Sequence, residues 1–178
     1  MYRHSLDLTG NAAEEGDFAQ QLFVQKFKER FGVEPTKTSL EEDRLEHKDY
    51  KFALRDNKGV IHSSHCDVKA PKRIRREDTE ASKDFTWVEF MSKGFPGWIY
   101  GKQDWIAFLL PDWQTFLMVK REKLLAVCNA LVMQKFVLNS DEAYHKLYCR
   151  PETTLGMIDV LSLISYDELK TCEGNWTL

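Results

Sequence analysis

The chain has 178 residues, of which 43% are hydrophobic and 12% aromatic, and its 28 acidic and 25 basic side chains give a net charge of −3. This length predicts one domain over residues 1–178 that buries a sizeable core, and the composition excludes general disorder. No apolar run is long enough for a membrane span, the N-terminus lacks the pattern of a secretion signal, and the four cysteines show no paired spacing. We therefore expect a cytoplasmic protein with reduced thiols, or one in the host cytoplasm if the source is a virus.

The first predicted element is a helix. Residues 12–31 carry apolar side chains at helical spacing from Phe18 to Phe31, and Gly32 is a suitable residue at which a helix ends. Residues 33–48 are polar and predict a loop or a short helix.

A tight β-hairpin follows. Residues 50–55 alternate apolar and polar, as a strand with one buried face does, and residues 56–59 have the composition of a turn. The second strand, residues 60–70, ends before Pro71, because proline cannot donate a ladder hydrogen bond. We expect Gly59 to take the left-handed position of a three-residue loop.

This loop determines which residues of the two strands face each other. In a three-residue loop Asp56 faces Val60 across the hairpin. Counting back along both strands places Asp49 opposite Asp67, and Lys69 lies two residues further on the same face. Two opposed carboxylates repel unless a cation lies between them, and hard oxygen ligands favour magnesium or manganese. Because a neighbouring lysine can stabilise a phosphoryl transition state, the hairpin predicts a metal-dependent phosphodiesterase.

The rest of the chain contains both strand and helix patterns. Residues 72–84 are charged and predict a solvated loop. Strands are predicted at 85–91, 97–110, 115–120, 144–149 and 158–164, and helices at 121–134 and 166–170. The pattern predicts an α/β fold with a mixed central β-sheet flanked by helices.

The hairpin acids and lysine resemble the signature of the PD-(D/E)XK nuclease superfamily. In that signature an acid at the start of one strand is followed, on the next strand, by an acid, any residue and a lysine. Asp49, Asp67 and Lys69 match these positions, with 17 residues between the two acids. The family adds an acid on a preceding helix, for which Asp17 is the best match, and often a polar residue on the following strand, where Glu89 lies. The resemblance implies a restriction-endonuclease-like core.

The resemblance covers about the first 125 residues. Residues 97–105 also resemble the tryptophan- and tyrosine-bearing strands of small phage and bacterial members. Three positions depart from the pattern, since Lys48 replaces the signature proline, Asp67 replaces the commoner glutamate, and Asp17 is shorter than the usual helix glutamate. The order of helix acid, hairpin acid and acid-any-lysine triplet carries the resemblance, because such a triplet occurs by chance in most proteins.

The resemblance implies a metal-dependent deoxyribonuclease, which is an endonuclease, an exonuclease or a junction resolvase. Asp49, Asp67 and the carbonyl of Val68 would hold one Mg²⁺ or Mn²⁺, which would polarise the phosphate and lower the pKa of a bound water. Lys69 would orient that water or neutralise the developing charge. The helix acid and the acid of the later strand would complete the acidic shell.

A basic cluster follows the proposed metal site. Its members, which would bind DNA phosphates without reading the base sequence, are Lys72, Arg73, Arg75 and Arg76. If this segment is only a solvated loop, the alternative phosphate contacts are Lys120, Arg121 and Arg150. The resemblance favours DNA over RNA as the partner, and a homodimer is compatible with a double-strand cutter.

Other constellations are weaker. His62, His65 and Cys66 suggest zinc, but strand alternation places His65 on the opposite face from the other two, and a closed site needs further ligands. His65 shares its face with Asp67, so it is placed to support a metal there. The five tryptophans could stack on bases, although core packing is their commoner role.

The alternative function is a nuclease-fold binding module that does not cleave, for example a viral protein that acts on a host defence or on a nucleic-acid complex. The departures at Lys48 and Asp17 favour it. A purely structural or interaction domain with a coincidental triplet is a third alternative.

Overall fold

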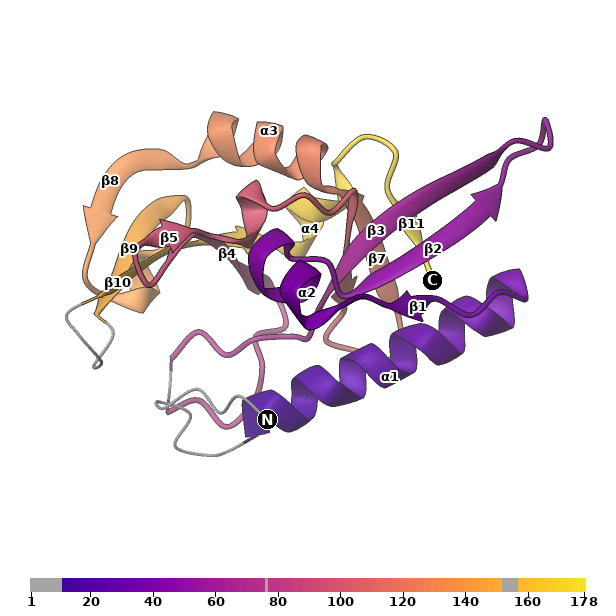
Figure 1. Cartoon of the computed structure of the whole chain (residues 1–178). Coiled ribbons are helices and arrows are strands. Elements are labelled where there is room, and N and C mark those ends of the chain that lie inside the picture. The colour runs from indigo at the N-terminus through magenta and orange to yellow at the C-terminus, as the bar shows by residue number, and fades with distance from the viewer. Residues whose placement is uncertain (1–10, 76, 152–156) are drawn as a thin grey trace.

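The chain folds into two β-sheets with flanking helices (Figure 1). The computed structural model describes residues 11–75, 77–151 and 157–178. The predicted α/β class with mixed sheets and flanking helices is confirmed. In the described residues, however, the strands divide between a six-stranded and a five-stranded sheet instead of forming one central sheet. The division arises because β4 pairs with the distant β10 and not with the hairpin.

The first sheet contains the predicted hairpin. Its strands, in spatial order, are β1 (Thr36–Lys37), β2 (Tyr50–Arg55), β3 (Ile61–Lys69), β6 (Trp105–Leu109), β7 (Phe116–Lys120) and β11 (Trp176–Thr177). β3 and β6 run parallel, whereas the other neighbouring strands are antiparallel. Parallel strands need a long crossover, and here the connection between them includes β4 and β5 of the second sheet.

The second sheet is also mixed. Its strands, in spatial order, are β5 (Phe95–Pro96), β4 (Phe85–Ser92), β10 (Ile158–Ser165), β9 (Lys146–Pro151) and β8 (Met133–Val137). β8 and β9 run parallel, and the other neighbours are antiparallel. The pairing of β10 with β4 is irregular between Val160 and Leu161, which shifts the register there.

The helices confirm the predicted segments, with one shorter than expected. They are α1 (Asn11–Phe31), α2 (Leu40–Glu46), α3 (Arg121–Leu131) and α4 (Tyr166–Lys170), and two 3-10 turns are η1 (Trp98–Tyr100) and η2 (Ser140–Glu142). Figure 1 shows α1 running alongside the first sheet. In the part of the chain that the structure describes, no helix is both long and apolar enough to cross a membrane.

The first sheet buries side chains on both faces. Phe23 and Phe27 of α1 are fully buried against one face. Their rings pack on Tyr50 and Phe52 of β2. The opposite face, which includes Ile106, joins an apolar cluster with the second sheet, α3 and α4. Each fully buried large apolar side chain contributes roughly 1.5–3 kcal/mol, so the alternation along these strands determines which face each side chain takes.

The predicted hairpin register is confirmed. Tyr50 pairs with Cys66, as the three-residue loop requires. The N–H of Asp56 donates to the carbonyl of Val60 at 2.9 Å, and Gly59 has a φ of 84°. This left-handed conformation costs glycine less than other residues because it has no Cβ. The two hairpin acids therefore meet across the strands as expected.

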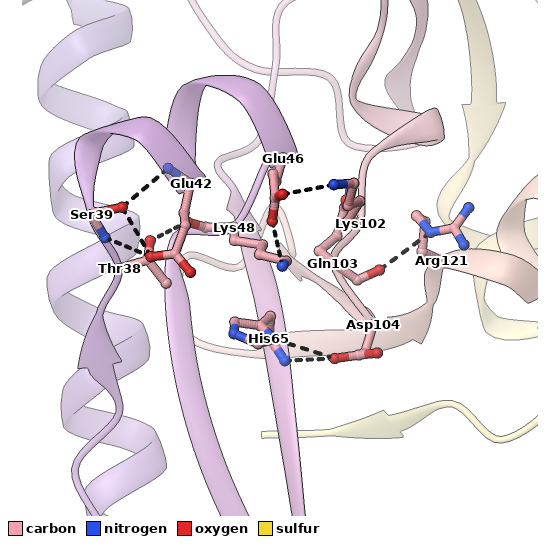
Figure 2. Close-up of polar contacts among 10 residues, drawn as sticks. All are labelled: Thr38, Ser39, Glu42, Glu46, Lys48, His65, Lys102, Gln103, Asp104 and Arg121. Atoms are coloured by element: carbon pink, nitrogen blue, oxygen red, sulfur yellow. Dashed lines mark hydrogen bonds and ion pairs between the residues drawn. The ribbon is translucent and has the colours of Figure 1, made fainter.

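The polar segment after α1 contains a short helix, α2, which is one of the two predicted alternatives. Ser39 and Glu42 form a capping box at its start (Figure 2). At its end Glu46 forms ion pairs with Lys48 at 2.5 Å and with Lys102 at 2.8 Å. The second pair connects α2 to the segment that precedes β6.

The prediction of one strand over residues 97–110 is wrong in its first half. That part is η1, whose carbonyl of Trp98 accepts a hydrogen bond at 2.7 Å from the buried amide of Gln103. Gly97 passes so close to β4 that a Cβ atom there would lie 2.2 Å from the carbonyl oxygen of Glu89. These tertiary contacts override the local strand pattern.

Strand β8 replaces the end of a predicted helix. The helix predicted at 121–134 ends at Leu131, because Val132 adopts an extended conformation with φ −78° and ψ 115°. The chain then continues as β8. Strands β1, β5 and β11 each contain two residues, which is too short for a periodic pattern to predict them.

Replacing Gly97 with alanine is expected to lower the free energy of unfolding by at least about 2 kcal/mol, because the backbone of β4 cannot easily move away from the new Cβ. Gly16→Ala is the matched control, since in α1 nothing lies within 4 Å of the added atom. This change should raise the free energy of unfolding by roughly 0.5–1 kcal/mol. Urea denaturation measures both, and equal effects would contradict the close approach of Gly97 to β4.

Candidate active site

The two hairpin acids lie side by side at one end of the first sheet. Asp49 directly precedes β2, and Asp67 lies near the end of β3. The N–H of Asp49 donates to the carbonyl of Cys66 at 2.8 Å, and its Oδ2 accepts the N–H of Val68 at 2.7 Å. The two acids are only 5% and 4% exposed. The hairpin therefore holds two adjacent carboxyl groups in the protein interior.

Lys69 joins this pair on the predicted face. Its Nζ lies 2.7 Å from Oδ2 of Asp67, and the same atom lies 5.1 Å from the ring centroid of Trp98 in η1. An ammonium over an aromatic ring is attracted by the negative face of the ring. Both contacts hold the ammonium beside the acids.

The two acids of the site are buried away from solvent, and this burial raises their pKa values. Burial raises the pKa of Asp49 to about 6, and the charge of Asp67 adds to this effect. Burial also raises the pKa of Asp67, although the ammonium of Lys69 opposes the change. Burial lowers the pKa of Lys69, but the two carboxylates outweigh it and the pKa is raised. An added cation would therefore relieve the repulsion between the acids.

The metal-free protein should lose stability through this site as the pH rises. Asp49 keeps its proton up to a pKa of about 6 when folded, compared with an ordinary value of 3.8. The stabilisation is fully present below the ordinary pKa and is lost as the pH rises through the folded pKa. Asp49→Asn, which mimics the protonated acid, should lack this loss. Urea denaturation from about pH 4 to 8 measures the difference, on the order of 3 kcal/mol. Parallel curves would contradict the raised pKa.

A third acid at this end of the hairpin is missed by the sequence pattern. Asp43 of α2 is half-buried, and burial raises its pKa, as does the charge of Asp49. Lys37 lies at the same end of the hairpin, with its Nζ 3.8 Å from Oδ1 of Asp49. The capping box is a local signal for α2, but no local signal indicates that Asp43 lies beside Asp49.

The second sheet brings Glu89 to the site. Burial raises the pKa of Glu89, and the ammonium of Lys69 opposes this rise. The backbone N–H of Trp98 also opposes the rise in the pKa of Glu89. Because the ring of Trp98 also contacts Lys69, η1 connects the hairpin lysine with the acid of β4.

The predicted helix acid, Asp17, is exposed on α1. Its charge acts on the hydroxyl of Tyr50, whose pKa is raised to about 12 mainly by burial. Glu15, two residues earlier, forms a bidentate ion pair with Arg73 through contacts of 2.6 and 3.0 Å. Glu15 is therefore the acid that connects α1 to the segment after β3, and the sequence pattern missed it.

The cations of the predicted phosphate-binding cluster differ in whether they form ion pairs within the protein. Arg73 is engaged by α1, and the guanidinium of Arg75 pairs with Asp141, with its Nε 2.7 Å from Oδ1. Lys72 is half-buried and has no ion-pair partner among the residues that the structure describes. Arg76 lies outside the described residues. Among the described members of the cluster, Lys72 is therefore the one without a direct ion pair, although the charges of Glu15 and Glu89 act on it.

The residues considered for zinc lie apart. His62 Nε2 contacts Asp56 Oδ2 at 3.0 Å near the hairpin turn, whereas His65 Nδ1 lies 3.7 Å from Asp104 Oδ2 (Figure 2). Cys66 is fully buried on the α1 side of the sheet. Within residues 11–75, 77–151 and 157–178, no group of three or more His, Cys, Asp or Glu side chains is placed to hold a metal ion.

The acids and the lysine at the end of the hairpin and on β4 offer oxygen ligands for a hard cation and an ammonium for an anion. Asp49, Asp67 and Lys69 come from one sheet, and Glu89 comes from the other. Comparisons with protein-family models, with curated protein sequences and with solved structures give no match.

Proposed function

We propose that the protein is a metal-dependent deoxyribonuclease of the PD-(D/E)XK type, with a restriction-endonuclease-like core built on β2 and β3. The observation that carries this proposal is the buried acid pair, Asp49 and Asp67, with the ammonium of Lys69 2.7 Å from Asp67. Hydrolysis of a phosphodiester needs a cation beside the phosphate and a group that stabilises the developing charge. On one face of the hairpin, the two acids would bind the cation and the ammonium of Lys69 would stabilise the developing charge.

The oxygen ligands at the site fit Mg²⁺ or Mn²⁺. Asp49, Asp67 and the carbonyl of Val68 would hold one ion. Mg²⁺ is commonly bound by one or two carboxylates and keeps several waters, so it does not require a third carboxylate or histidine. The bound ion would polarise the phosphate and lower the pKa of a coordinated water.

The other residues of the site would act on the ammonium and on the DNA. Lys69 would orient the attacking water or neutralise the charge that develops on the phosphate. Glu89, whose charge acts on the ammonium of Lys69, would hold Lys69 from the second sheet. Asp17 would contribute to the acidic shell from α1, and Lys72, which has no ion-pair partner within the described ranges, would attract the DNA backbone.

One observation favours the alternative of a nuclease-fold binding module that does not cleave. The ammonium of Lys69 already neutralises Asp67 by a contact of 2.7 Å, so the acids have a counterion without any metal. Such a module would bind nucleic acid or a nucleic-acid complex with the same surface and would not hydrolyse it.

Incubation with linear and with circular DNA, with and without Mg²⁺ or Mn²⁺, separates these functions. Metal-dependent cutting of circles indicates an endonuclease, and metal-dependent loss of linear DNA alone indicates an exonuclease. A protein that binds DNA but leaves both substrates intact with either metal would be a binding module, and the nuclease proposal would be rejected. Asp167→Asn is a suitable control variant, because this acid is 90% exposed on α4.

A further inference from the structure

A guanidinium of the second sheet is held in a fixed position near the candidate active site. Arg150 of β9 pairs in register with Asp159 of β10. Its Nε and Nη2 lie 3.2 and 2.7 Å from Oδ2 of Asp159. Asp159 is 1% exposed, and its Oδ1 accepts the N–H of Lys93 at 2.8 Å. A buried and hydrogen-bonded carboxylate therefore orients the guanidinium.

Arg150 lies on the same face of the second sheet as Glu89. Glu89 pairs with Leu161, and Leu161 pairs with Tyr148. Side chains two residues apart on a strand share a face, so Arg150 follows Tyr148 on that face. Burial raises the pKa of Glu89, and the charge of Arg150 is among those that oppose the rise. The guanidinium thus acts on an acid of the candidate site.

Lys72 approaches the same place from the segment after β3. Burial lowers the pKa of Lys72, the nearby charges of Lys69 and Arg150 lower it further, and the charges of Glu15 and Glu89 oppose the change. Three cations therefore gather around Glu89. Lys69 and Arg150 have acid partners at 2.7 Å, whereas burial is the main cause that disfavours the charge of Lys72, and an anion bound beside Lys72 would stabilise that charge.

The guanidinium retains donors for such an anion. Nε and one side of Nη2 face Asp159, and an arginine has five N–H donors in a planar fork. No acceptor in the part of the chain that the structure describes contacts the edge that includes Nη1, so this edge can bind a second acceptor, and the side chain is 27% exposed. Guanidinium groups bind phosphate oxygens with two parallel hydrogen bonds, so a phosphate fits this edge.

We propose that Lys72 and Arg150 form a phosphate-binding subsite, in which the buried Asp159 orients the guanidinium toward a DNA phosphate next to the one that Lys69 acts on. The identity of the ligand rests on the proposed function. The subsite would hold the DNA against the second sheet, so that the neighbouring phosphodiester lies at the hairpin acids.

DNA affinity without divalent metal tests the subsite separately from cleavage. Fluorescence anisotropy with a labelled oligonucleotide in EDTA, at several salt concentrations, should show that Arg150→Met and Lys72→Met each weaken binding at least about tenfold at low salt. Each variant should also flatten the salt dependence by about one unit of log slope for the lost phosphate contact. Lys170→Met is the matched control, because this lysine is exposed and pairs with Asp167 on α4. If Arg150→Met and Lys72→Met have no larger effect than this control, the subsite is rejected.

Asp159→Asn distinguishes an orienting role of Asp159 from a purely electrostatic one, because the two roles predict changes in DNA affinity of opposite sign. Removal of a negative charge would by itself strengthen DNA binding, whereas loss of the orienting carboxylate should weaken it several-fold. Arg150→Lys should weaken binding for the same reason, although it keeps the charge. Stronger binding by a folded Asp159→Asn, together with unchanged binding by Arg150→Lys, would overturn the role of Asp159.

Lys72→Met keeps the test decisive if the substitutions at Arg150 and Asp159 prevent folding, because it leaves the buried Arg150–Asp159 pair intact. Titration of the wild type and of this variant with inorganic phosphate and with a nucleoside monophosphate shows whether free phosphates also enter the subsite. Wild-type protein that binds DNA through these residues but does not cut it would reject the nuclease and retain the subsite. Wild-type protein that cuts DNA, with Arg150→Met and Lys72→Met equal to the control in binding, would retain the nuclease and reject the subsite.

Discussion

Lys69→Ala is expected to reduce DNA cleavage a hundredfold or more while DNA binding and metal binding persist. The ammonium would act on the charge that develops during the reaction, and the loss of one preorganised stabilising group has a cost on this order. Asp49 and Asp67 remain, and the substitution removes the cation that now lies 2.7 Å from Asp67. Calorimetry with Mn²⁺ should therefore still detect binding.

Lys102→Ala is the matched control for this experiment, because the Lys102 side chain is 70% exposed and pairs with Glu46 on the surface. The control should cut DNA at the wild-type rate. If Lys69→Ala lowers cleavage only in proportion to a weaker DNA affinity, Lys69 is a phosphate anchor. Unchanged cleavage would reject the motif as assigned to this hairpin.

Asp67→Asn is expected to abolish cleavage and to weaken Mn²⁺ binding strongly without unfolding the protein. The substitution removes one of two buried acids that repel each other, and the neutral amide keeps the volume of the side chain. Lys69 loses one partner but keeps the nearby charge of Asp49. Cleavage assays, calorimetry and thermal unfolding together measure these effects, with Asp167→Asn as the control.

The outcomes for Asp67→Asn separate two roles. Wild-type activity would show that the metal is not held at Asp67. A variant that unfolds would favour a structural role, in which the contact between Asp67 and Lys69 stabilises the end of the hairpin. Loss of activity with retained fold and reduced metal affinity supports the proposed nuclease.

Much of the site could be predicted from the sequence because the hairpin is a local structure. The three-residue turn that ends at Gly59 sets the register of the hairpin. Because successive side chains of a strand point to opposite faces, Asp67 and Lys69 then share one face. The Asp49–Asp67 neighbourhood and the helices α1 and α4 follow from such short-range patterns. These predictions needed no knowledge of the remaining chain.

The residues that other elements bring to the candidate site could not be predicted from such short-range patterns. The charge of Glu89 acts on Lys69, and Gly97 lets η1, whose Trp98 ring contacts Lys69, approach β4; both features depend on packing between the two sheets. Glu15, not the predicted Asp17, pairs with Arg73, which depends on how α1 lies along the segment after β3. The periodicity of a helix or strand predicts which face a side chain takes, but it does not predict which other element lies against that face.

The sequence by itself determined the α/β class, the hairpin with its register, and the common face of Asp67 and Lys69. Only the tertiary structure decided that the strands form two sheets, that η1 interrupts the predicted strand at 97–110, and that Arg150 shares a face of the second sheet with Glu89. The reason is the range of the interactions. Turn chemistry and side-chain periodicity act over a few residues, whereas sheet assignment and the meeting of charges depend on burial shared between segments that are distant in the chain.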